Sequence, residues 1–295
     1  MVNAALYLRR PLLVTGKPGT GKSTLAYAIS EQLGLGPVLN WPINTRMTLQ
    51  DGLYRYDAIG RLRDSNIAAH RIAGMRQRAR PDNIHDLGRY IRLGPLGTAL
   101  LPWSRPRVLL IDEIDKSDID LPNDLLHVFE DGEFVIPELT RLLPQSGTGS
   151  AQDEHETVDI LVQTEDEQMR AIPNGIVRCT RFPIVILTSN GERDFPPAFL
   201  RRCLRLEMPQ PAASDLEAII RSHLGNELFA KAEQQIRDYV ADFVLDRDQR
   251  KKGDLATDQL LNLVYMTTQD LLNESLDLTP EVREKLKKEL LRTLA

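Results

Sequence analysis

The sequence predicts an α/β fold with a mostly parallel five-stranded sheet, followed by a small all-helical domain. Five short aliphatic runs with long spacers between them occur within the first 208 residues. Runs that are apolar throughout indicate strands buried on both faces, and long spacers leave room for helical crossovers. No further β-like run follows residues 209–211. We therefore expect an αβα sandwich over residues 1–208 and a helical domain over residues 212–295.

Each expected strand is a short run bounded by turn residues. The runs cover residues 11–15, 38–43, 107–111, 183–187 and 204–208. The second run is the poorest, because Pro42 lacks the N–H group that a sheet ladder uses. The other runs are rich in Leu, Ile and Val and contain few polar residues, as expected for strands in the middle of a layered fold.

Amphipathic periodicity replaces the strand pattern after residue 211. The first helix is expected to begin with Ser214 as its N-cap, because an acidic residue, Glu217, follows three positions later. The pattern continues over residues 230–245, 258–272 and 280–294. This amphipathic periodicity predicts a helical domain that contains no strand.

Two segments fit neither pattern and are interpreted as insertions. Residues 65–106 are rich in arginine and glycine, and residues 134–181 contain a long polar tip. The second segment predicts a strand pair, in which residues 133–136 pair with residues 159–162. Both segments exceed what a plain βαβ crossover requires, which is about a dozen residues.

Composition excludes several classes of protein. Mean hydropathy is −0.29, and no apolar run approaches the roughly 18 residues that a membrane helix needs. Arg9 and Arg10 interrupt any signal-peptide core. The two cysteines, Cys179 and Cys203, are too few for a disulfide scaffold or a four-cysteine zinc site. We therefore expect a cytoplasmic protein that does not enter a membrane.

The charge is unevenly distributed along the chain. The net charge of −5 argues against a globally basic nucleic-acid binder. Residues 61–80 nevertheless hold six arginines and one acid, whereas residues 151–170 hold seven acids and one base. These segments create two local fields of opposite sign. The alternative interpretation is two unrelated, solvated surface loops.

A glycine-rich loop carries the strongest chemical signal. It matches the pattern GxxxxGK(S/T), follows a predicted strand and precedes a helical pattern that ends at Gly34. Glycines let successive N–H groups point at phosphate oxygens, and the helix N-terminus adds a partial positive charge. We expect Lys22 to reach the β- and γ-phosphates and Ser23 to ligate Mg²⁺. The expected nucleotide-binding residues are Gly16, Lys17, Pro18, Gly19, Thr20, Gly21, Lys22, Ser23 and Thr24.

Two acids end the third strand. Asp112 and Glu113 follow four aliphatic residues and so emerge at the carboxyl edge of the sheet, where ligands bind in open α/β folds. Asp112 is expected to hold Mg²⁺ through water, and Glu113 to take a proton from the attacking water. Acidic turn residues alone would explain such a strand end, but the intact phosphate loop favours the catalytic interpretation.

Two later features admit two interpretations each. Asn190 follows the fourth strand and could orient the attacking water against the γ-phosphate, or it could be a turn former. Arg201 and Arg202 end a short helix and could neutralise transition-state charge in the site of a neighbouring subunit. A solvated helix end favoured by the macrodipole would place the same arginines there.

Together these motifs resemble those of an AAA+ ATPase. Finer features are similar to the MoxR branch: Gly94, Pro95 and Leu96 stand just before the third strand, and residues 126–133 lead into a hairpin. That branch carries an insert in its second helix and a hairpin insert before its fourth strand, where the two misfit segments lie. The resemblance covers about residues 2–270.

The resemblance implies a ring, usually hexameric, that hydrolyses ATP with Mg²⁺ between subunits. It implies that Arg202 is the arginine finger, with Arg201 as the second candidate, and that Asn190 is sensor 1. MoxR proteins are chaperone-like activators, often beside a partner with a von Willebrand A domain. The sequence departs from the family at sensor 2: residues 251–258 contain no arginine, and Lys252 is the candidate substitute.

Other functions remain open at the level of sequence. A nucleic-acid-directed motor could use the arginine-rich residues 65–106 against phosphates, although aromatic residues are scarce there. A GTP-dependent switch would need a loop that recognises guanine, and the sequence contains no such motif. A small-molecule kinase would have no need of the paired arginines, Arg201 and Arg202. A structural role for the nucleotide would not need Glu113. An ATP-driven remodeller of a protein partner agrees best with all of these features.

Overall fold

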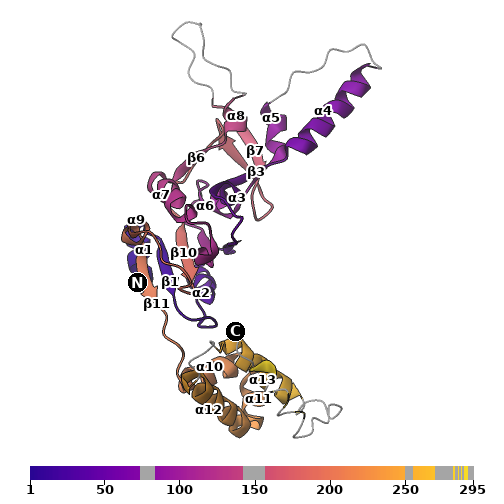
Figure 1. Ribbon diagram of the computed structural model, residues 1–295. Coiled ribbons are helices and arrows are strands. Elements are labelled where there is room, and N and C mark those ends of the chain that lie inside the picture. The colour runs from indigo at the N-terminus through magenta and orange to yellow at the C-terminus, as the bar shows by residue number, and fades with distance from the viewer. Residues whose placement is uncertain are drawn as a thin grey trace. The chain divides into compact units, whose positions relative to one another are not determined.

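The structure is a computed structural model that describes residues 1–73, 84–141, 157–249, 255–269, 282, 285, 287 and 289–291. The chain forms two compact units (Figure 1). The first unit comprises Met1–Val14 and Ser23–Leu206, and the second comprises Thr15–Lys22 and Glu207–Ala295. Lys252, the candidate substitute for the sensor-2 arginine, lies outside the described residues, as do parts of the charged segments 61–80 and 151–170.

The predicted five-stranded sheet is confirmed. Its order is β11-β1-β10-β5-β2, and β5 pairs in parallel with both β10 and β2. The strands are β1 (Leu12–Thr15), β2 (Leu39–Pro42), β5 (Val108–Asp112), β10 (Ile184–Ser189) and β11 (Leu204–Glu207). Parallel strands align their carboxyl ends, so the ends of β5 and β10 share one edge of the sheet.

Burial along the strands follows their places in the sheet. The central strands β5 and β10 are buried almost throughout, as expected from their continuous apolar runs. The edge strand β2 alternates, with Leu39 and Trp41 buried and Asn40 and Pro42 exposed. Proline is tolerated at such an edge, because its missing N–H group removes no bond to a further strand.

Helices cover this sheet. Helices α2 (Thr24–Leu33) and α6 (Pro95–Ala99) pack against β5, and α7 (Leu121–Asp131) contacts α9 (Pro197–Arg202). Helix α1 (Val2–Leu8) precedes β1. As predicted, α2 ends at Gly34, which adopts the left-handed conformation that glycine reaches without a steric cost.

The two inserted segments meet in a second sheet of order β3-β4-β7-β8. Strand β4 of the first segment pairs with β7 of the second. The elements within and beside these segments are α3 (Leu49–Leu53), β3 (Tyr54–Tyr56), α4 (Ala58–Ala73), α5 (Ile84–Leu87), η1 (Gly88–Tyr90), β4 (Ile91–Leu93), β6 (Glu133–Val135), α8 (Pro137–Thr140), β7 (Asp159–Gln163), β8 (Met169–Pro173) and β9 (Ile176–Arg178). Helix α4 thus begins seven residues before the expected start of the first insertion at residue 65.

The predicted pairing within the second insertion is wrong. Strand β6 pairs with β9, and β7 pairs with β8, both antiparallel. The tight turn between β7 and β8 explains this, since Thr164 exchanges backbone and side-chain hydrogen bonds with Gln168. A local hairpin closes a much shorter loop than the pairing of residues 133–136 with 159–162 would require.

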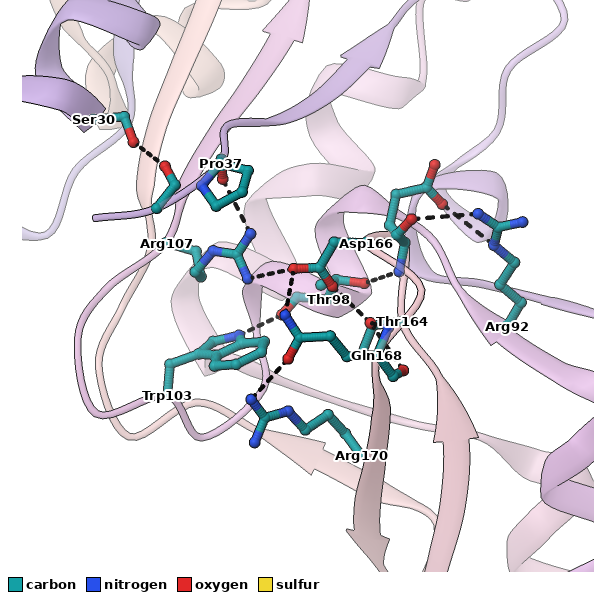
Figure 2. A network of polar contacts seen from close by, with 12 residues as sticks. Ser30, Pro37, Arg92, Thr98, Trp103, Arg107, Thr164, Asp166, Gln168 and Arg170 are labelled. Carbon is teal, nitrogen blue, oxygen red and sulfur yellow. Dashed lines mark hydrogen bonds and ion pairs between the residues drawn. The ribbon is translucent and has the colours of Figure 1, made fainter. Parts of the chain in front are cut away.

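A buried polar network ties this turn to the start of β5 (Figure 2). Arg107 donates to Asp166 at 2.9 Å and to the Pro37 carbonyl at 3.0 Å. Trp103 lies between two guanidinium groups, with Arg107 at 4.9 Å and Arg170 at 4.4 Å from the ring centroid. Burial raises the pKa of Asp166, but hydrogen bonds from Thr164 and Arg107 outweigh that effect, so its pKa is lowered overall.

The helical part of the second unit contains α10 (Ala213–Leu224), α11 (Asn226–Lys231), α12 (Glu233–Gln249) and α13 (Thr257–Gln269). Its core includes Leu216, Ile220, Phe229, Ile236, Phe243 and Leu260. The expected cap at Ser214 is wrong, because α10 begins earlier and the Asp215 carboxylate accepts the Ala212 N–H at 3.0 Å. Within the described residues, no helix is long and apolar enough to span a membrane.

Candidate functional site

The glycine-rich loop folds around the ammonium group of Lys22. This group donates to the carbonyl oxygens of Gly16 at 2.8 Å and Lys17 at 2.9 Å, and Lys22 is buried. Thr20 also donates to the Lys17 carbonyl, at 2.9 Å. The lysine side chain therefore points into the loop rather than into solvent. A phosphate group held by the loop would contact its positive charge there.

Two glycines of the loop cannot carry a side chain. A Cβ atom on Gly16 would lie 2.7 Å from the Met208 carbonyl oxygen. A Cβ atom on Gly19, whose φ is +75°, would lie 2.5 Å from the backbone nitrogen of Thr257. Thr257 begins α13, so the start of this helix lies against the loop within the second unit. The missing sensor-2 arginine was expected in this region.

Ser23 and Asp112 are joined directly in the first unit. The Ser23 hydroxyl donates to Asp112 Oδ1 at 2.7 Å, although the two residues are 89 positions apart. The Thr188 hydroxyl donates to the same oxygen at 2.6 Å. A hydroxyl and a carboxylate in contact are the hard oxygen donors that Mg²⁺ prefers. The predicted pair therefore fits this ion.

Glu113 occupies an unusual backbone conformation, with φ 61° and ψ 48°. Non-glycine residues adopt this left-handed region at a cost, and such residues cluster at functional sites. The Glu113 N–H donates to Thr188 Oγ1 at 2.9 Å, which helps to hold the conformation. Thr188 thus contacts both Asp112 and Glu113 through one hydroxyl.

The Glu113 carboxylate has a cationic partner. Lys116, in η2 (Ile114–Lys116), donates to Glu113 Oε2 at 2.7 Å. This hydrogen bond raises the pKa of Lys116. Both side chains are about two-fifths exposed, so the ion pair is weak and can open at little cost.

Asp115 fixes the loop that carries Asn190. It is 3% exposed, and its Oδ2 accepts the N–H groups of Asn190 at 2.9 Å and Glu192 at 3.1 Å. Its Oδ1 is buried and has no hydrogen-bond partner within the described part of the chain. Asn190 itself donates weakly from Nδ2 to Glu192 at 3.5 Å.

Arg201 and Arg202 lie away from these carboxylates. Arg202 forms an ion pair with Glu130 at the end of α7, and Arg201 donates to the Pro197 carbonyl at 3.3 Å. Leu204 donates to the Pro11 carbonyl, which places the end of α9 beside the start of β1. The Ser23–Asp112 pair instead lies at the other edge of the sheet, where β5 ends. A four-residue strand separates these edges by about 13 Å.

The structure therefore brings together Ser23, Asp112, Glu113 and Asn190, and it sets Arg201 and Arg202 apart from them. Three contributing residues had no predicted role: Asp115, Lys116 and Thr188. Thr188 lies near the end of β10, and Asp115 and Lys116 lie in η2, which follows β5. Nearness to the strand ends was the available signal, but the hydrogen-bond partners of these residues depend on the fold. Both cysteines are free thiols, and burial raises the pKa of Cys203 to about 12.

Comparison with known families finds one match. Residues 11–203 match the family described as AAA domain (dynein-related subfamily). The matched segment runs from the start of β1 to the end of α9, so it contains every predicted site residue of the α/β fold. A search of curated proteins finds no significant match.

Proposed function

This chain belongs to the AAA domain family, in its dynein-related subfamily, and on that premise we propose that it binds ATP and hydrolyses it with Mg²⁺. The loop of residues 16–24 would hold the phosphates through backbone N–H groups and Lys22. Ser23 and Asp112 would hold Mg²⁺, which offsets charge on the phosphate oxygens. The contact of 2.7 Å between these two side chains supports that assignment.

Glu113 is proposed as the general base for the attacking water. A base must be able to release its existing partner, and the half-exposed Glu113–Lys116 pair meets that requirement. Asn190 is proposed to orient the same water as sensor 1. Its backbone is fixed by Asp115, which leaves the side-chain amide at the edge of the sheet where Asp112 lies.

We further propose that hydrolysis takes place between subunits of a ring, with Arg202 serving the site of a neighbour. The observation that carries this is the position of Arg202 at the sheet edge opposite to Ser23 and Asp112. An arginine placed there cannot reach the γ-phosphate of its own subunit. A head-to-tail ring would bring it to the next subunit, and six copies is the usual number in the family.

The proposed substrate of the motor is a protein partner. The similarity to the MoxR branch at Gly94, Pro95, Leu96 and residues 126–133 supports this finer assignment. Hydrolysis would loosen the Arg202 contact, and the inserted strands and helices would pass that change to a partner. In the MoxR branch the partner often has a von Willebrand A domain, so such a protein is the first one to test.

The mass in solution of the Glu113→Gln variant, with and without Mg-ATP, tests this proposal. The substitution should trap ATP unhydrolysed. Light scattering should then report about six times 33.3 kDa with Mg-ATP and a smaller mass without it. Adding Arg202→Ala in the same background should weaken the ring. A chain that binds ATP and remains at 33.3 kDa would contradict the ring and the assigned role of Arg202.

A further inference from the structure

A charged cavity lies within the first unit, and no residue of the phosphate loop lines it. It has a volume of about 380 Å³ and is lined by α1 and by the segments just before β5 and β10. The start of β5 is the end opposite to Asp112, so this cavity and the carboxylate site lie at different edges of the sheet. Its cations are Arg9, Arg105 and Arg181, and no acidic residue lines it.

The fold holds two of these arginines side by side. The Thr180 hydroxyl donates to the Trp103 carbonyl at 3.0 Å, and the Ile184 N–H donates to the Arg107 carbonyl at 2.9 Å. Arg105 and Arg181 lie within the two short segments between these hydrogen bonds. Backbone and side-chain hydrogen bonds therefore place the two segments next to each other, and both arginines line the cavity.

The third arginine comes from the end of α1. Arg9 has φ 52° and ψ 44°, a left-handed conformation that is uncommon for a residue with a side chain. Three segments distant in sequence thus deliver three positive charges to one cavity. Within the described residues, none of the three guanidinium groups forms an ion pair.

The three arginines are exposed, so solvent screens part of the repulsion between their like charges. Arginine stays protonated, and a bound anion would offset the repulsion that remains. The chain has more acidic than basic residues, with a net charge of −5, yet no acidic residue lines this cavity to neutralise the arginines. The planar guanidinium group matches phosphate oxygens with two parallel hydrogen bonds, which lysine cannot do.

We propose that this cavity binds a small molecule carrying two or more phosphate groups. Its volume lies within the range of small-ligand sites, roughly 300–1,000 Å³. Phosphate oxygens accept from Arg9, Arg105 and Arg181, while the hydroxyl groups of Tyr7 and Ser104, which also line the cavity, supply neutral hydrogen bonds. The cavity and the phosphate loop share no residue, so the proposed ligand does not depend on the proposed ATPase activity.

Calorimetric titration with inorganic pyrophosphate tests the proposal. The full chain should carry Lys22→Ala, so that the phosphate loop contributes little to binding. In that background, Arg9→Gln, Arg105→Gln and Arg181→Gln together should weaken pyrophosphate binding at least tenfold. The control replaces three exposed arginines elsewhere, Arg55→Gln, Arg63→Gln and Arg89→Gln, and should leave the affinity unchanged. Thermal melting should confirm that each variant is folded.

Three outcomes would overturn the proposal. The first is an absence of pyrophosphate binding in the Lys22→Ala chain. The second is equal loss of affinity in the triple variant and the control, which would indicate general charge attraction. The third is binding of a fluorescent single-stranded oligonucleotide, lost in the triple variant, with no binding of pyrophosphate. That last result would assign the cluster to a nucleic-acid backbone.

Discussion

The two ends of strand β5 use charge in opposite ways. At its start, Arg107 and Asp166 form an ion pair whose side chains are only 7% and 15% exposed. Just past its end, Glu113 and Lys116 form a pair whose side chains are 42% and 41% exposed. Each end also contains one buried atom without a hydrogen-bond partner in the described part of the chain, Arg107 Nε and Asp115 Oδ1.

The difference in exposure suits the two ion pairs to different roles, one in stability and one in catalysis. A buried ion pair is expensive to break, because the remaining charge is left out of water. The Arg107 pair therefore fixes the β7–β8 hairpin to the central sheet. A half-exposed pair opens and closes at little cost, because water replaces either partner. The Glu113 pair can therefore release its carboxylate for catalysis.

The largest expected effect comes from Glu113→Gln. Turnover should fall by about 10²–10⁴-fold, because the amide cannot accept the proton of the attacking water. Affinity for ATP should remain near that of the wild type. Steady-state hydrolysis and nucleotide-binding assays check this, with Glu31→Gln on the exposed face of α2 as the matched control. A variant that hydrolyses ATP normally would place the general base elsewhere.

Arg107→Met should mainly affect stability. Removing the arginine leaves Asp166 buried without its cation, which costs about 3–5 kcal/mol of the free energy of unfolding. Urea titration measures this. Arg92→Met removes a longer ion pair to Glu165 at 3.8 Å that is exposed to solvent, and it should cost no more than about 1 kcal/mol. Equal losses in the two variants would contradict an anchoring role for Arg107.

Thr188→Val should affect both stability and turnover. The substitution preserves shape but leaves the Glu113 N–H without its acceptor and removes one donor to Asp112, at a cost of about 1–3 kcal/mol. Turnover should decline because both carboxylates lose a positioning contact. Thr188→Ser retains the hydroxyl and should restore turnover more fully than stability. A serine variant as impaired as the valine variant would show that the methyl group, not the hydroxyl, matters.

Lys116→Ala should have the smallest effect, and in the opposite direction. Freeing Glu113 from a pair worth at most about 1 kcal/mol should raise basal turnover by less than about fivefold. Because salt screens exposed pairs, raising ionic strength should increase wild-type turnover toward that of the variant. A clear fall in turnover would instead indicate that Lys116 contacts the substrate.

Sequence patterns predicted the central sheet because its strands are nearly uniform aliphatic runs. They also predicted a shared role for Ser23 and Asp112 from motifs with a fixed structural context, and the two side chains are hydrogen-bonded. The pairing of β6 with β9 was missed, because alternation within a strand does not specify its partner. Thr188 and Asp115 were missed as contributors for a similar reason: their hydrogen bonds join segments about 75 residues apart.

The position of Trp103 also gives the molecule a built-in optical reporter. The chain has two tryptophans, and the other, Trp41, is buried in β2. The Trp103 ring is held between the Arg107 and Arg170 guanidinium groups, so its emission depends on whether β8 remains in place. A change in intrinsic fluorescence on adding nucleotide or partner would therefore report movement of this hairpin, without any added label.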